Sequence, residues 1–169
     1  MAFQVAVCGP AEATETERRA AEEVGELLAR RGAVVLCGGG AGVMAAVAAG
    51  AHRANGLVIG ILPGTDASDA APGLSATVRT GLGEARNVVL VNSADAVVVI
   101  GGSWGTLSEQ ALAVRRGGPP VVVLRGWQVL DPSGHPVPGV TTVNSPAEAV
   151  AVALAAVPTS RPLTDGAPS

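Results

Sequence analysis

Short aliphatic segments alternate with longer amphipathic segments along most of this chain. Seven short runs of valine, leucine, isoleucine and alanine predict strands buried on both faces: Phe3–Cys8, Val34–Cys37, Leu57–Leu62, Ala76–Thr80, Ala96–Ile100, Pro120–Leu124 and Thr141–Val143. Five segments with helical spacing follow or separate them: Thr14–Arg31, Val43–Ala54, Glu84–Val91, Thr106–Arg116 and Pro146–Ala156. This alternation predicts an α/β fold in three layers, with a doubly wound parallel sheet of six or seven strands.

Local signals support these boundaries and a single domain over residues 1–157. Thr14 and Glu17 form a capping-box pattern at the first helix, and Pro146 can start the last one. The segment 63–73 contains aspartates and prolines and is long for a compact domain, which favours a lid or binding loop. Residues 158–169 are small, polar and rich in proline, so we expect a disordered tail.

The charge pattern argues against a nucleic-acid partner. All eleven basic residues are arginine, the formal net charge is −3, and no stretch gathers arginine on one face. A nucleic-acid binder usually shows a basic patch. His52 and His135 have no partners at metal-ligand spacing, so we expect no metal site and no required cofactor.

The cysteines and the lengths of the apolar runs indicate the cellular compartment of the protein. No apolar run reaches the ~18 residues of a membrane span, and the opening residues lack the basic segment of a signal peptide. We therefore expect a cytoplasmic protein. Cys8 and Cys37 each end an aliphatic run, where a free cysteine behaves as a small buried hydrophobe. A disulfide between them is the less favoured alternative.

A first glycine-rich turn, Gly38-Gly39-Gly40-Ala41-Gly42, joins the second predicted strand to a helix. Glycines allow close backbone approach, and a helix N-terminus favours anions such as phosphate. The turn follows the second strand and lacks the Gly-Lys-Ser/Thr ending of a P-loop, which argues against a standard NAD site or an NTPase. The alternative is a turn that only packs a helix on a strand. The candidate ligand contacts are Gly38, Gly39, Gly40, Gly42 and Met44.

A second turn of the same design follows the strand that ends at Ile100. Its candidate phosphate contacts are Gly101, Gly102, Ser103, Gly105 and Thr106. Thr106 and Glu109 also fit the N-cap and N3 positions of a capping box, and the spacing alone does not choose between the two roles. Because the carboxyl ends of parallel strands meet at one edge, both turns should lie on the same edge and share one anion site.

Three side chains could complete such a site. Arg86 lies near the start of a predicted helix and could meet Glu109 across the cleft; a solvated surface arginine is the alternative. Trp104 sits in a glycine turn, where it could stack on a base or pterin ring, or pack against a lid or a second subunit.

Three motifs together resemble the LOG-like (SLOG) Rossmann-fold superfamily, long labelled lysine decarboxylase-like. They are Gly38 to Met44, then Ala85-Arg86-Asn87, then Gly101 to Glu109, and the likeness extends from Phe3 to Ala156. The resemblance implies a Rossmann-like fold and a nucleotide-type phosphate site. In its best-known members, nucleoside 5′-monophosphate phosphoribohydrolases that cleave the N-glycosidic bond, Arg86 and Glu109 would be catalytic, with phosphate held by Gly101, Gly102, Gly105 and Thr106.

Two departures point to a second branch of that superfamily. Asn87 stands where the hydrolases have lysine, and Ile100 stands where they have proline. Both resemble the branch that includes molybdenum cofactor carriers, which bind a pterin phosphate. The sequence therefore leaves two functions open: a phosphoribohydrolase, and a carrier of molybdenum cofactor as cargo without turnover.

The helices around the second turn also indicate self-association. Residues 88–91 and 111–114 are apolar around much of the helix circumference, whereas a helix on one sheet face needs only one apolar stripe. We expect a homodimer, or a tetramer built from dimers, with the interface beside the site. Burial beneath the chain's own last helix is the alternative.

Overall fold

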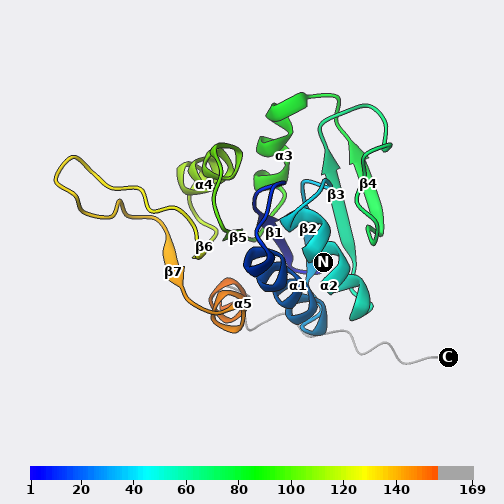
Figure 1. The fold of residues 1–169 in the computed structure, drawn as a ribbon, viewed down its shortest axis with the longest axis horizontal. Helices are drawn as coiled ribbons and strands as arrows, with labels where there is room; N and C mark the ends of the chain where they lie inside the picture. Colours follow the sequence, from blue (N-terminus) through cyan, green and yellow to red (C-terminus); the bar gives the residue numbers. More distant parts are fainter. Residues whose placement is uncertain (156–169) are drawn as a thin grey trace.

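The computed structural model describes residues 1–155 and forms one seven-stranded sheet (Figure 1). The strands are β1 Gln4–Cys8, β2 Val34–Cys37, β3 Val58–Leu62, β4 Ala76–Arg79, β5 Ala96–Ile100, β6 Val121–Leu124 and β7 Thr141–Val143. Their order is β4-β3-β2-β1-β5-β6-β7, and every neighbouring pair is parallel. The doubly wound parallel sheet predicted from the sequence is confirmed.

The central strand β1 is where the chain reverses its direction of travel across the sheet. Strands β2 to β4 are added on one side of β1, and β5 to β7 are added on the other. Val5 pairs with Val35 of β2 and with Ala96 of β5. In open α/β sheets such a reversal leaves a crevice outside the carboxyl ends of the strands, so the ends of β2, β1 and β5 mark the place to look for a site.

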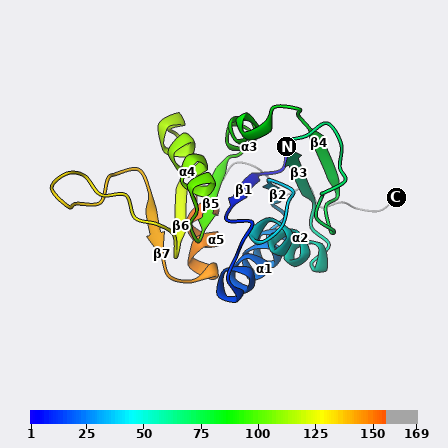
Figure 2. The same cartoon turned by 45° about the horizontal axis from the view of Figure 1, so that its top comes forward.

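Within the described residues, five helices cover the two faces of the sheet (Figures 1 and 2). Helices α1 Glu15–Arg30, α2 Val43–Arg53 and α5 Pro146–Leu154 pack on one face, and α3 Arg86–Asn92 and α4 Trp104–Arg116 pack on the other. A single 3-10 turn, Gly83–Ala85, precedes α3. Because α5 packs against α1, β5 and β6, the alternative that it buries α3 and α4 is wrong.

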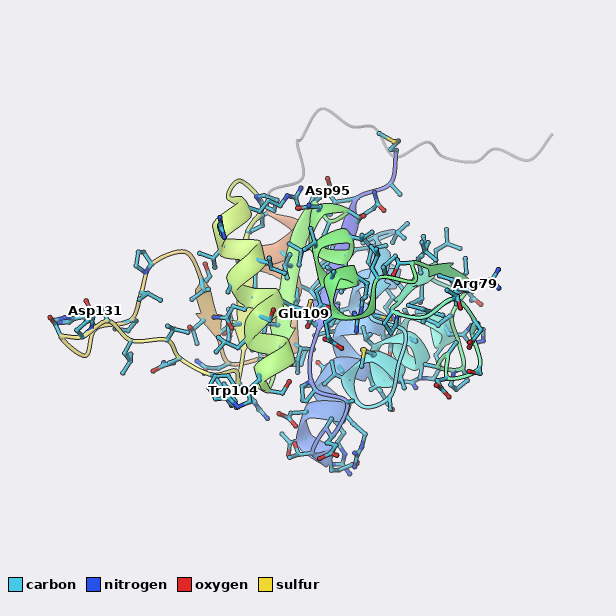
Figure 3. The ribbon with its side chains drawn as sticks, turned by 90° about the horizontal axis from the view of Figure 1, so that it is seen from above. Arg79, Asp95, Trp104, Glu109 and Asp131 are labelled. Carbon is cyan, nitrogen blue, oxygen red and sulfur yellow. The ribbon has the colours of Figure 1, made fainter. Side chains whose placement is uncertain are left out.

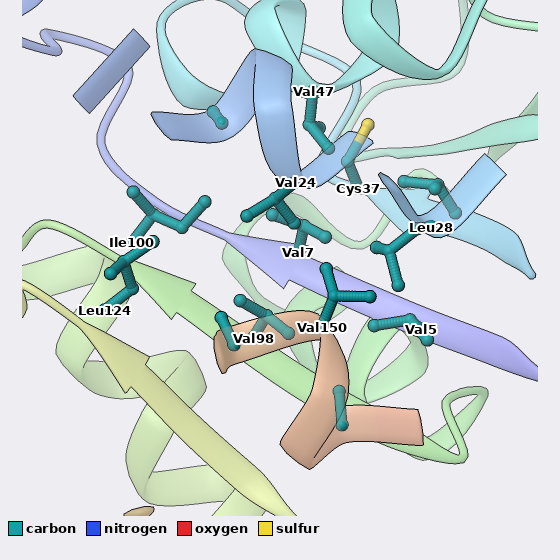
Figure 4. Packing of buried hydrophobic residues seen from close by; sticks show 14 of the residues in the cluster. Val5, Val7, Val24, Leu28, Cys37, Val47, Val98, Ile100, Leu124 and Val150 are labelled. Atoms are coloured by element: carbon teal, nitrogen blue, oxygen red, sulfur yellow. The ribbon is translucent and has the colours of Figure 1, made fainter. Parts of the chain in front are cut away.

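Alternate side chains of β1 enter two separate apolar cores. Val5 and Val7 join the core under α1, α2 and α5, drawn in Figure 4, whereas Ala6 and Cys8 join the core under α3 and α4. Cys37 lies in the first of these cores. The two cysteines therefore face opposite sides of the sheet, both are free, and the alternative of a Cys8–Cys37 disulfide is excluded.

Helices α1 and α2 approach closely because glycines replace side chains at their contact. A Cβ on Gly50 would collide with the backbone of Glu22, and one on Gly25 would collide with that of Val47. Helix α1 begins with the predicted capping box: Glu17 N donates to Thr14 Oγ1 at 3.2 Å, and Thr14 N donates to Glu17 Oε2 at 2.7 Å.

Helix α4 starts earlier than the sequence pattern predicts. Its N-cap is Ser103, whose hydroxyl accepts from Thr106 N at 3.2 Å, and its first residue is Trp104. The capping-box role of Thr106 and Glu109 is therefore wrong, because the serine three residues before Thr106 takes the N-cap position. Glu109 then stands almost two turns inside the helix, where it is free for another role.

The segment between β6 and β7 projects from the body of the molecule, with Asp131 near its tip (Figures 1 and 3). A single antiparallel bridge between Leu130 and Pro136 joins its two sides. Among the described residues, no helix is long and apolar enough to cross a membrane. The tail predicted at 158–169 lies outside the described residues.

Candidate functional site

A pocket of about 280 Å³ opens beside the first glycine turn. One wall is formed by residues 38–40 together with Met44, and the opposite wall by residues 62–64 and the loop that follows β3. Arg86 closes one side. The pocket thus lies at the carboxyl ends of β2 and β3, on the sheet edge that the topology indicates.

The glycines of the first turn are required by its geometry. Gly39 has φ +76°, and a Cβ on it would collide with Leu62. Gly42 has φ +64°, and a Cβ there would collide with the carbonyls of Pro10 and Ala11. Gly42 therefore packs against the loop after β1 and does not line the pocket, unlike Gly38, Gly39, Gly40 and Met44.

The loop after β3 is fastened to this turn by the backbone. Ala71 N donates to Gly39 O at 2.7 Å, which holds the loop across the pocket. Asp66, Ser68 and Asp69 line the pocket from this loop, and Asp66 Oδ1 accepts hydrogen bonds from both Ser68 N and Ser68 Oγ. Loop length predicted a binding segment here, but no sequence signal indicated which side chains would face the pocket.

Arg86 lies directly over the first glycine turn. A Cβ on Gly38 would collide with Nη1 of Arg86, and it would lie 2.7 Å from Nη2, so a larger residue at this position would displace the guanidinium. The Arg86 side chain is 12% exposed, and its Nε and Nη1 are buried and have no hydrogen-bond partner within residues 1–155. Buried donors without partners are costly, and a guanidinium with free N–H groups binds phosphate or carboxylate well.

The structure brings Arg86 and Glu109 together, as the sequence suggested. Arg86 Nη1 lies 3.5 Å from Glu109 Oε1, and the Glu109 side chain is 8% exposed. Glu109 points from α4 toward the strands at the centre of the molecule (Figure 3). It does not line the pocket, whereas Arg86, which it contacts, does.

Burial dominates the electrostatics of this pair. It raises the pKa of Glu109 to about 7, against the opposing effects of Arg86 and of the neighbouring Cys8 thiol. Burial also raises the pKa of Cys8 well above its usual range, and the nearby Glu109 carboxylate adds to that effect. Near neutral pH, Glu109 is therefore divided between its neutral and ionised forms, and Cys8 remains a thiol.

The second glycine turn lies on the same sheet edge as the first but outside the pocket lining. Gly101 and Gly102 follow β5, two strands away from β2. The indole of Trp127 covers Gly102, where a Cβ would collide with it. The hydroxyls of Ser103 and Thr106 lie 2.9 Å apart and bond to each other. None of Gly101, Gly102, Ser103, Gly105 and Thr106 lines the pocket.

Trp104 extends outward from the start of α4 (Figure 3). It is 79% exposed, and its ring forms a T-shaped pair with that of Trp127, with ring centres 5.3 Å apart and planes at 86°. Trp127 belongs to the projecting segment after β6. Sequence reasoning did not find this contact, because the two tryptophans lie 23 positions apart with no shared pattern.

The fold, the glycine turn and Arg86 define a Rossmann-like protein of the SLOG type. A family model described as "SLOG cluster4 family" matches residues 2–150, and the chain belongs to that family. An uncharacterized protein of Archaeoglobus fulgidus is 41% identical over 139 residues, which are 76% of this chain and 88% of that protein.

Two solved structures are similar over most of the chain. The molybdenum cofactor binding protein of Rippkaea orientalis has a TM-score of 0.83 and 32% identity, covering 94% of this chain and 99% of that one. The molybdenum cofactor carrier protein of Chlamydomonas reinhardtii has a TM-score of 0.75 and 30% identity, covering 89% of this chain and 95% of that one.

Proposed function

We propose that this protein binds a phosphate-bearing pterin of the molybdenum cofactor type at the Arg86 pocket and holds it without chemical conversion. The observation that carries the proposal is the Arg86 guanidinium, which borders the pocket with Nε and Nη1 unpartnered. A phosphate that reaches this guanidinium would accept hydrogen bonds from N–H groups that have no partner among the described residues. The molybdenum cofactor binding and carrier proteins among its structural neighbours support this choice of cargo.

The remaining walls of the pocket suit a ring system attached to that phosphate. Met44 and Leu62 offer apolar surface, and Gly38 to Gly40 allow close approach of a flat group to the backbone. The volume of about 280 Å³ is near the lower end of small-molecule pockets, at about 300 Å³. Asp66 and Asp69 line the loop side, where carboxylates can accept hydrogen bonds from the N–H groups of a pterin.

The position of Glu109 favours binding over turnover. Cleavage of an N-glycosidic bond needs a carboxylate beside the sugar to stabilise the developing positive charge. Glu109 lies outside the pocket lining and its side chain is 8% exposed, and burial raises its pKa to about 7, so that it is only partly ionised at neutral pH. The phosphoribohydrolase alternative would require Glu109 to reach a substrate from outside the pocket lining.

Cofactor retention tests this proposal. The protein is mixed with molybdenum cofactor released from a molybdoenzyme, separated from free cofactor by gel filtration, and assayed for bound pterin. We expect the wild-type protein and Arg115→Ala, an exposed site at the far end of α4, to retain cofactor. Arg86→Ala should retain at least tenfold less, because the charged hydrogen bonds to phosphate are lost.

Two results would contradict the proposal. Equal retention by wild type and Arg86→Ala would remove Arg86 from the site. Release of free base from AMP or another nucleoside monophosphate, abolished by Glu109→Ala, would establish the hydrolase instead.

A further inference from the structure

The two members of the Arg86–Glu109 pair have different surroundings. Arg86 borders the pocket and covers Gly38, whereas Glu109 does not line the pocket and lies beside Cys8. Their separation of 3.5 Å between Nη1 and Oε1 is longer than a charged hydrogen bond, and Nη1 has no partner that meets hydrogen-bond geometry. The guanidinium is therefore held near the carboxylate without being locked onto it.

We propose that Glu109 is the internal counter-ion and positioning residue of Arg86, and that binding of a phosphate-type anion to Arg86 is coupled to uptake of a proton by the Glu109 carboxylate. This inference rests on the proposed function, since it takes Arg86 as the anion-binding group. The proton comes from solvent and goes to a carboxylate oxygen of Glu109, and no covalent bond to the ligand forms.

The physical reason is competition between two anions for one cation. With Glu109 ionised, the buried pair is neutral, and an arriving dianion places further negative charge beside the carboxylate at low effective dielectric. With Glu109 protonated, the full charge of Arg86 is available to the ligand. Coupling between two binding events is reciprocal. If anion binding favours protonation of Glu109, protonation of Glu109 therefore raises the affinity for the anion.

The proton affinity of Glu109 lies in the range where such coupling acts near neutral pH. Burial raises its pKa to about 7, so a modest further rise on anion binding moves the carboxyl from half-protonated to mostly protonated. The thiols of Cys8 and Cys37, on the adjoining strands β1 and β2, do not titrate near neutral pH. Burial raises the pKa of Cys37 to about 11 and that of Cys8 well above its usual range.

Three other carboxylates face this region. Glu84, from the 3-10 turn before α3, adds negative charge that raises the pKa of Glu109. Asp66 and Asp69 line the loop side of the pocket, and hydrogen bonds from Ser68 lower the pKa of Asp66, so that it stays ionised above pH 6. Within the part of the chain that the structure describes, Glu109 is the buried carboxylate beside Arg86, and the others can be tested separately by substitution.

Sulfate is a suitable probe because it resembles phosphate and remains a dianion throughout pH 6–8. Its affinity for the wild-type protein is measured by calorimetry at pH 6, 7 and 8, in two buffers of different ionisation heat. We expect the affinity to fall by about tenfold between pH 6 and pH 8, with more than half a proton taken up per sulfate near pH 8. Glu109→Gln should bind sulfate with the same affinity at all three pH values and take up no proton.

A matched variant separates Glu109 from its neighbours. Glu84→Gln removes a nearby negative charge that raises the pKa of Glu109. The sulfate affinity of this variant should still fall as pH rises, but the midpoint of the fall should lie at a lower pH. The inference is overturned if the wild type does not bind sulfate at pH 6, if its affinity does not change with pH, or if Glu109→Gln shows the wild-type slope. Arg86-dependent cofactor retention would survive each of these results, so the proposed function can stand when the coupling fails.

Discussion

At the scale of single residues, Glu109 combines deep burial with a neighbouring charge that only partly stabilises its ionised form. Its pKa is raised from 4.5 to about 7 in the folded protein. Between these two values the folded state binds more protons than the unfolded state, so the free energy of unfolding falls as pH rises. The stabilising effect is fully present below about pH 4.5 and is lost as pH rises through 7.

The Glu109→Gln variant should remove this pH dependence. Urea unfolding is measured at pH 5 and pH 8. Between these pH values the free energy of unfolding of the wild type should fall by roughly 3 kcal/mol more than that of the variant, because one pKa unit corresponds to about 1.4 kcal/mol. Parallel pH profiles for the two proteins would show that Glu109 titrates normally in the fold.

Which residues meet at the site can be predicted from the sequence more readily than how they meet. Arg86 and Glu109 could be paired because both stand near helix ends at the ligand edge of a parallel sheet. The arrangement, with Arg86 at the pocket and Glu109 outside its lining, depends on side-chain packing around Gly38 and Cys8. No periodicity or spacing in the sequence carries that information.

At the scale of elements, the strands and most helices follow from local pattern, whereas the start of α4 does not. Aliphatic runs identify buried parallel strands because both faces of such strands are covered. Ser103 and Thr106 are both good N-cap residues, and the choice of Ser103 depends on how the turn after β5 is folded. The covering of Gly102 by Trp127 depends on the distant segment after β6.

Two glycines of the second turn should respond oppositely to alanine. Gly105 lies within α4, and a Cβ there would meet nothing closer than Ser103 Oγ at 3.8 Å, so Gly105→Ala should stabilise the protein by about 0.5–1 kcal/mol. Gly102→Ala should destabilise it, because the added Cβ displaces the Trp127 ring. Thermal unfolding checks both.

The Gly105→Ala variant also tests where the phosphate lies. Because Gly105 is outside the pocket lining, Gly105→Ala should retain cofactor like the wild type. Loss of cofactor retention by a fully folded Gly105→Ala protein would indicate that the phosphate binds at the second glycine turn.

At the scale of the whole molecule, the face formed by α3 and α4 carries apolar surface that the other described residues leave exposed. Val88 on α3 is 44% exposed, and Trp104 at the start of α4 is largely exposed. Helix α5 packs on the opposite face of the sheet and gives this surface no cover. The homodimer expected from the sequence therefore stays a prediction, with α3 and α4 as the expected interface.

Charge placed on that face should separate the subunits. Val88→Asp should shift the protein from dimer to monomer in sedimentation equilibrium, because an isologous contact would bury the charge twice. Val78→Asp is a matched control, since Val78 is 45% exposed on the edge strand β4. A wild-type monomer at micromolar concentration, or an unchanged dimer in Val88→Asp, would contradict the assignment.

The central claim is that the Arg86 pocket binds an intact pterin phosphate. Native mass spectrometry after loading with molybdenum cofactor tests it most directly, because this method measures the mass of the protein together with its bound ligand. The account predicts a wild-type complex whose added mass is that of the intact pterin phosphate, and no such complex for Arg86→Ala. Wild-type protein that carries no added mass, or an Arg86→Ala protein that carries the same added mass, would contradict it.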